Sequence, residues 1–172
     1  VDRLNGKGYD YWALGHVHTR EIVQQVPWIV FPGNTQGRHA RETGPKGCML
    51  VDAEPAIGIR EVEFVATDVA RWQHLSIDIA AIATEDDLHA TVQSAVRAAQ
   101  AVAENRILAL RLTLDGRGPL HGRLVAGRES LRAQLAASVG EASAGMAWLE
   151  KVRLKVSAPL DLARLARRDD PI

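Results

Sequence analysis

Two histidines separated by one residue follow a short apolar run in the sequence Trp-Ala-Leu-Gly-His-Val-His, residues 12–18. If the chain is still extended there, His16 and His18 point to the same side with Cα atoms about 6.6 Å apart. Imidazole nitrogen is a common ligand for divalent transition metals. The spacing therefore predicts a metal site in which each histidine holds one ion of a pair.

A loop rich in cationic side chains follows, with the sequence Pro-Gly-Asn-Thr-Gln-Gly-Arg-His-Ala-Arg-Glu at residues 32–42. Arginine can hold a phosphate through paired, charge-assisted hydrogen bonds. We therefore predict phosphate contacts from Asn34, Arg38, His39 and Arg41. The alternative is an ordinary solvated loop in which Arg41 and Glu42, its one acid before Lys46, are structural partners.

The elements that position these residues are short strands. Apolar runs bounded by glycine and proline predict strands at residues 9–14, 21–26, 28–31, 48–52 and 57–65, the last with a break at Arg60-Glu61. Pro32-Gly33-Asn34 predicts a turn after the third of them. We expect a layer of a β-sandwich with no helix between Tyr9 and Ala66.

After Thr67 the pattern becomes that of a small α/β unit. It predicts strands at residues 72–79, 106–114 and 148–156, with helices from a cap at Thr84 to Asn105 and at about 128–139. The expected order is β-α-β-α-β, and residues 120–125 are either a further strand or the start of the second helix. The expected domains are residues 1–66 and 67–172.

Two groups of cations in this second part have open interpretations. Lys151, Arg153 and Lys155 form a basic stripe on the last strand, which is either its solvated face or a contact for a DNA backbone. Near the end of the chain, Arg164, Arg167 and Arg168 are offset by acids, and we interpret them as a solvated helix end.

Composition limits the class of protein. Across 172 residues, 21 lysines and arginines balance 21 aspartates and glutamates, so no whole-chain field attracts nucleic acid or a membrane. The single cysteine, Cys48, excludes an internal disulfide, fits a reducing compartment and is expected to be buried in its strand. No apolar run reaches the roughly 18 residues of a membrane span. We expect a soluble, cytoplasmic protein.

Residues 10–18 and 32–42 together resemble the calcineurin-like metallophosphoesterases. Gly-His-x-His is a motif of the whole superfamily, whereas the Pro-Gly-Asn-Thr-Gln-Gly-Arg-His loop is similar to the DNA repair exonuclease branch, of SbcD-type and YhaO-like nucleases. The resemblance covers about residues 9–52. It implies the C-terminal strands of a metallophosphoesterase β-sandwich, followed by an α/β capping domain.

The resemblance also implies a function. Such enzymes are phosphodiesterases with two divalent metal ions, usually Mn²⁺, whose bridging water attacks phosphorus in line. His16 would bind one ion and His18 the other. The implied substrate is DNA, and the implied partner is an SbcC-like ATPase subunit. Whether the protein forms a homodimer is left open.

The family's remaining ligands come from Asp-x-His, Gly-Asp and Gly-Asn-His-Asp motifs and a further histidine, all before Gly-His-x-His. None of these motifs precedes Gly15, and the chain opens at Val1 without methionine. We therefore expect the C-terminal part of a DNA exonuclease, inactive alone because the general acid also lies upstream. The alternatives are a phosphoesterase with a substrate other than DNA, and a DNA- or partner-binding module without catalysis.

Overall fold

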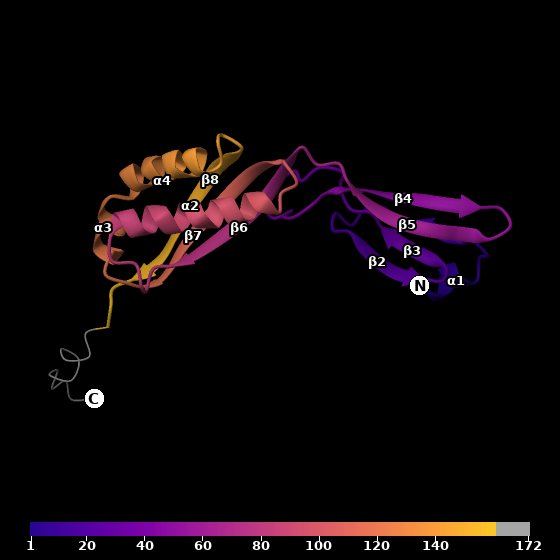
Figure 1. Ribbon diagram of the computed structural model, residues 1–172. Helices are drawn as coiled ribbons and strands as arrows, with labels where there is room; N and C mark the ends of the chain where they lie inside the picture. Colours follow the sequence, from indigo (N-terminus) through magenta and orange to yellow (C-terminus); the bar gives the residue numbers. More distant parts are fainter. Residues whose placement is uncertain (161–172) are drawn as a thin grey trace, which may run out of the picture. The chain divides into compact units, whose positions relative to one another are not determined.

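The computed structural model describes residues 1–160, which form a mixed α/β structure with three small sheets and four helices. They divide into two compact units (Figure 1). The first contains residues 1–73 and 106–109, and the second contains residues 74–105 and those from Leu110 on. The expected domain boundary near residues 66–71 stays a prediction. The arginines at 164, 167 and 168 lie outside the described residues.

The first unit contains a sheet of three short strands in the order β1-β3-β2. Its central strand, β3 (Trp28–Phe31), is parallel to β1 (Tyr11–Ala13) and antiparallel to β2 (Glu21–Gln25). The apolar sequence of β3 suits this central place, and its Ile29 and Val30 are buried. Because β1 and β3 are parallel, the loops that follow them leave the sheet at the same edge.

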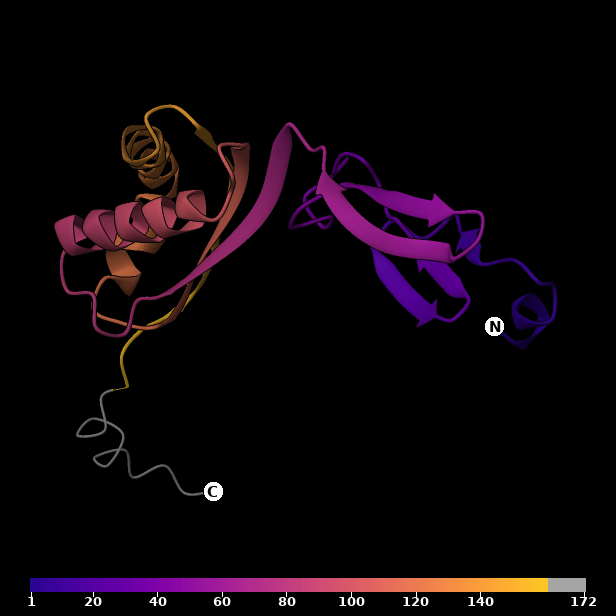
Figure 2. The ribbon, with the colours of Figure 1, turned by 45° about the vertical axis from the view of Figure 1, so that its right-hand side comes forward.

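The same unit contains a hairpin of β4 (Gly47–Glu54) and β5 (Gly58–Ala66), drawn in magenta in Figure 2. The predicted break in the second strand is a β-bulge. Asp52 pairs with Glu61 and the next residue, Ala53, pairs with Ile59, so Arg60 has no partner residue on β4. The expectation that Cys48 is buried was wrong, since Cys48 is exposed. Strand alternation places it on the face opposite its half-buried neighbour Met49. A short helix, α1 (Asp2–Asn5), precedes both sheets.

The third sheet has the order β6-β7-β8, formed by β6 (Ala70–Asp78), β7 (Ile107–Arg117) and β8 (Ala147–Ser157). In both views α2 (Glu85–Ala101) and α4 (Arg128–Ala142) lie side by side on one of its faces (Figures 1 and 2). Alternate leucines of the central strand are buried, as period-two patterning predicts: Leu108, Leu110, Leu112 and Leu114.

The predicted order of this part is confirmed, with one additional short helix and with differences in where the elements begin and end. Thr84 caps α2 in a reciprocal capping box with Asp87, but the helix ends at Ala101, before Asn105. Strand β7 continues through Gly116, whose φ of 95° is readily adopted by glycine. Residues 121–126 are a separate short helix, α3 (His121–Ala126), divided from α4 at Gly127. Among residues 1–160, no helix has the length and apolar character needed to cross a membrane.

Candidate metal and phosphate site

Four of the six predicted site residues line one cavity of about 490 Å³: His16, His18, Asn34 and Arg38. The loop after β1 supplies the two histidines, and the loop after β3 supplies the other two residues. Loops at the carboxyl ends of adjacent parallel strands meet outside the sheet, a common position for ligand sites. His39 and Arg41 are not part of the cavity lining.

The backbones of these two loops approach each other closely at Gly33. The Asn34 N–H donates to the His18 carbonyl at 3.2 Å. Gly33 has a φ of 79°, and a Cβ there would lie 2.8 Å from the His18 carbonyl oxygen and 2.9 Å from the Arg20 nitrogen. Glycine at this position is therefore what lets the loops meet.

The histidine loop does not have the extended geometry expected from the sequence. Strand β1 ends at Ala13, and His16 has a φ of 81°. A left-handed backbone is sparsely populated by residues other than glycine, and such residues cluster at functional sites. The chain therefore bends between the two histidines, and the loop rather than strand alternation brings both to the cavity.

Behind the cavity lies a buried carboxylate, Glu42, bound by four groups. Its Oε2 accepts from the Arg38 backbone N–H at 2.7 Å and from Asn34 Nδ2 at 3.2 Å. Its Oε1 lies 2.7 Å from His18 Nδ1 and 3.5 Å from His39 Nε2.

These contacts keep Glu42 ionised. The backbone hydrogen bond from Arg38, with those from His18 and Asn34 and the charge of His39, outweighs burial and lowers the pKa of Glu42 to about 2. The sequence analysis considered Glu42 only as a structural partner of Arg41 and did not predict its contact with His18. The available signal was that it is the one acid in a loop of cations.

Arg38 contacts the site through both its backbone and its side chain. Its guanidinium Nη2 lies 2.9 Å from His18 Nε2 and 3.2 Å from His18 Nδ1. His39 instead accepts from the Arg41 backbone N–H at 3.2 Å, through Nδ1. The predicted phosphate-binding set is thus divided, with Asn34 and Arg38 at the cavity and His39 and Arg41 outside its lining.

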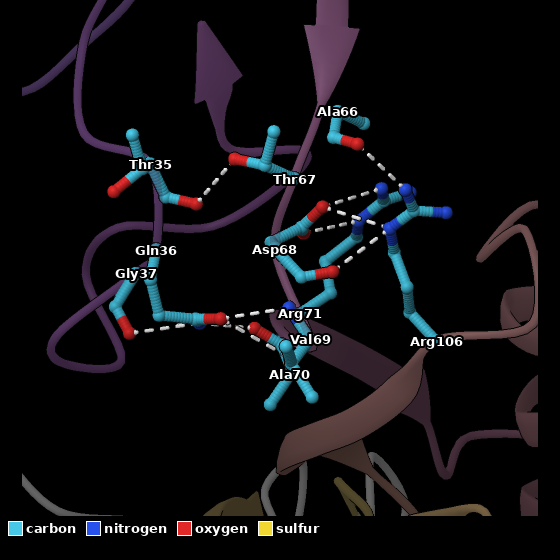
Figure 3. A network of polar contacts seen from close by, with 10 residues as sticks. All are labelled: Thr35, Gln36, Gly37, Ala66, Thr67, Asp68, Val69, Ala70, Arg71 and Arg106. Carbon is cyan, nitrogen blue, oxygen red and sulfur yellow. Dashed lines mark hydrogen bonds and ion pairs between the residues drawn. The ribbon is translucent and has the colours of Figure 1, made fainter.

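The backbone of the loop after β3 is also held by hydrogen bonds from residues 67–70 (Figure 3). Gln36 Oε1 accepts from the backbone N–H of Val69 at 2.8 Å and of Ala70 at 3.3 Å. Thr67 Oγ1 donates to the Thr35 carbonyl at 3.1 Å. The segment that follows β5 therefore fixes the loop that carries Arg38.

That segment contains a second buried carboxylate, Asp68 (Figure 3). Arg71 Nε donates to it at 2.8 Å and Arg106 Nε at 2.9 Å, while Arg106 Nη2 donates to the Ala66 carbonyl at 2.9 Å. Burial alone would raise the pKa of Asp68, but the hydrogen bonds and charge of Arg71, with contributions from the Lys46 backbone and Arg106, lower it.

The two cavity histidines fit a metal ion in donor chemistry but do not complete a site. Histidines that bind metal through one ring nitrogen usually donate a hydrogen bond to a carboxylate from the other nitrogen. Glu42 has this relation to His18, through Nδ1. Within residues 1–160, no group of three or more histidine, cysteine, aspartate or glutamate side chains could hold an ion. His16 and His18 would therefore be two ligands of a larger set.

One Asp-x-His sequence, Asp87-Leu88-His89, lies in the second unit, on α2. Asp87 closes the capping box, Leu88 is buried, and His89 Nδ1 lies 2.7 Å from Ser138 Oγ. These contacts give the three residues roles in helix capping and packing.

Comparison with known proteins identifies the second part of the chain. Residues 72–157 match the family described as metallophosphoesterase YhaO, middle domain. A curated relative, the uncharacterized metallophosphoesterase YhaO of Bacillus subtilis (strain 168), is 40% identical over 79 residues, which are 45% of this chain and 19% of that protein. The chain thus spans about a fifth of the length of this relative.

The family match falls on the part of the chain that the motif did not cover. The resemblance rested on residues 9–52, and the α/β part was expected only to be a plausible cap. The family description instead applies to the segment from β6 to β8. Because the match covers half of the 172 residues, the chain belongs to the YhaO metallophosphoesterase family.

Proposed function

We propose that this chain supplies two metal ligands and a phosphate contact to a two-metal phosphodiesterase that hydrolyses DNA as an exonuclease. The observation that carries the proposal is the convergence of His16, His18, Asn34 and Arg38 on one cavity. Membership of a metallophosphoesterase family supports hydrolysis of a phosphate ester. The rest of the ligand set and the general acid would come from outside the described residues.

Each cavity residue has a chemical role in this proposal. His16 and His18 would hold divalent ions, with Mn²⁺ as the expected metal, which when bound supply Lewis acidity and an activated water. The Arg38 guanidinium would bind a phosphate oxygen of the substrate, for which its planar, charged donors are suited. Asn34 is bonded to Glu42 and holds the loop in place beside the histidines.

The choice of DNA as substrate is supported by the cationic loop and by the last strand. Lys151, Arg153 and Lys155 are exposed on β8, whereas Glu150 pairs with Arg111 at 2.6 Å. Exposed cations on a strand suit a nucleic acid backbone, and such contacts weaken steeply with salt. An SbcC-like ATPase partner, a homodimer and a cytoplasmic location belong to the same proposal.

The test uses the full-length product of the gene that encodes this chain. Mn²⁺-dependent hydrolysis of end-labelled duplex DNA is measured for the wild type and for His16→Ala and His18→Ala, with folding checked by circular dichroism. We expect both variants to lose at least about 100-fold in rate, because each removes a metal ligand. His74→Ala, at a position outside the cavity lining, is the matched control.

Full activity of a folded His18→Ala protein would refute the metal assignment. Metal-dependent hydrolysis of bis(p-nitrophenyl) phosphate by a wild-type protein that leaves DNA intact would support a phosphoesterase with another substrate. DNA binding by a wild-type protein that hydrolyses neither would support the binding module.

A further inference from the structure

The His18 ring contacts a carboxylate, Glu42, and a guanidinium, Arg38. Glu42 Oε1 lies 2.7 Å from Nδ1, and a carboxylate can only accept, so Nδ1 must carry a proton. Arg38 Nη2 lies 2.9 Å from Nε2 and 3.2 Å from Nδ1, over the face of the ring, and does not distinguish the two nitrogens. Since the Nδ1 proton is directed at Glu42, Nε2 is the nitrogen with a free lone pair. The contact with Glu42 therefore selects the tautomer with the proton on Nδ1.

The carboxylate that selects this tautomer is held in place from behind. Its Oε2 accepts from the Arg38 backbone N–H at 2.7 Å and from Asn34 Nδ2 at 3.2 Å, and the Glu42 side chain is 7% exposed. With one oxygen held by these two donors, the other is directed at His18. A surface carboxylate without such support would sample several rotamers.

We propose that Glu42 is a positioning residue that keeps the His18 proton on Nδ1 and so presents Nε2 to a metal ion. The inference rests on the proposed function in assigning a metal to His18. Glu42 acts through His18 and does not itself bind the ion. The tautomer, however, is a property of the metal-free chain and can be measured separately.

A role limited to holding the loop makes a different prediction for Glu42→Gln. In this variant the Arg38 N–H and Asn34 amide still require an acceptor, which keeps the oxygen of the substituted amide on their side. The NH₂ group of that amide then faces His18 and requires an acceptor there. Nδ1 can accept only if the proton moves to Nε2, and a protonated Nε2 cannot bind metal.

The experiment reads the tautomer directly, by long-range ¹H–¹⁵N NMR on the metal-free chain at about pH 8, above the ordinary titration range of histidine. His18 signals are assigned by their loss in His18→Gln. We expect Nδ1–H in the wild type and Nε2–H in Glu42→Gln. Glu61→Gln, an exposed acid on β5, is the matched control and should give the wild-type tautomer.

The second readout is Mn²⁺ affinity of the full-length protein, by electron paramagnetic resonance of the free ion. Glu42→Gln should weaken it about 10- to 100-fold, the usual effect of losing a carboxylate behind a metal-bound histidine. Glu42→Asp keeps an acceptor and should retain the wild-type tautomer.

An Nε2–H tautomer in the wild type would overturn the inference, and this result needs no variant to fold. A folded Glu42→Gln protein with unchanged tautomer and affinity would also overturn it. If the tautomer switches and Mn²⁺ affinity falls as expected but the wild type does not cleave DNA, the positioning role stands and the proposed DNA function fails.

Discussion

Glu42 and Asp68 are both buried carboxylates of the first unit, yet their partners differ in charge. Asp68 is bound by two guanidinium groups, from Arg71 and Arg106. Glu42 is bound by a backbone N–H, an amide and two imidazoles, among which His18 also lines the cavity. The Asp68 cluster links the segment after β5 to Arg106 and so has a structural role. The Glu42 cluster instead orients His18, whose Nε2 lies at the cavity side of the ring away from Glu42.

The difference shows how to separate structural from functional buried acids. A carboxylate between arginines satisfies charge with charge, and removing it takes away the anion that the two guanidinium groups share. A carboxylate held mainly by a backbone N–H, an amide and an imidazole is easier to replace, but its replacement changes the protonation of the group it orients. Substitution of Asp68 should therefore change mainly the free energy of unfolding, and substitution of Glu42 should change mainly metal affinity.

The largest expected effect on stability is that of Asp68→Asn. Loss of its charge leaves the Arg71 and Arg106 cluster without its central anion, which should lower the free energy of unfolding by about 3–5 kcal/mol in urea denaturation. Asp52→Asn is the control, because Asp52 is 59% exposed and 3.8 Å from Arg60, a pair worth about 0–1 kcal/mol. A loss below about 1 kcal/mol for Asp68→Asn would remove the distinction between the two acids.

Gly33→Ala should have the next largest effect, on the Glu42 side of the comparison. The added methyl would overlap the His18 carbonyl at a φ of 79°, so the two loops must separate. We expect a loss of about 1–3 kcal/mol, with reduced Mn²⁺ affinity because His18 moves. Gly6→Ala, where a Cβ meets nothing within 4 Å, is the control. Wild-type metal affinity in Gly33→Ala would mean that the loop contact does not position His18.

Acid should weaken the Glu42 cluster in a defined pH window. The pKa of Glu42 falls from an ordinary 4.5 to about 2, so the folded state binds a proton less readily than the unfolded state. Its stabilising contribution is complete above about pH 4.5 and is lost as the pH falls toward 2. Urea midpoints measured across this range should fall less steeply for Glu42→Gln than for the wild type. Parallel curves would show that Glu42 is not a source of the acid sensitivity.

Sequence patterns predicted the features that depend on local rules. The capping box at Thr84 and the leucine alternation of β7 follow from neighbours a few residues apart. The phosphate contact assigned to Arg38 stays a prediction, although Arg38 lines the same cavity as His16 and His18. The family resemblance agreed with the comparison, although it was based on a different part of the chain.

What could not be predicted depends on contacts between distant residues. Glu42 meets His18 across 24 residues, and Asp68 meets Arg106 across 38. Each contact requires a close approach that no local pattern specifies, such as the glycine against the His18 carbonyl. The left-handed backbone of His16 is likewise imposed by the fold, because histidine has no local preference strong enough to require it.

The smallest effect on stability is expected for Arg38→Ala. This variant separates metal binding by His18 from phosphate binding by Arg38. Its exposed guanidinium lies 2.9 Å from His18 Nε2, so its positive charge disfavours a cation bound at that nitrogen. Mn²⁺ affinity of the full-length protein should therefore be unchanged or rise a few-fold. DNA affinity should fall about 5- to 10-fold, with a salt dependence shallower by about one phosphate contact.

Arg41→Ala is the matched control for Arg38→Ala, because Arg41 is an exposed arginine of the same loop outside the cavity lining. Gel-shift titrations at several salt concentrations compare the two variants. Equal losses of DNA affinity would show that the loop acts only through its total charge. A loss confined to Arg38→Ala would place the phosphate at the cavity, because the two substitutions remove the same charge and differ only in position.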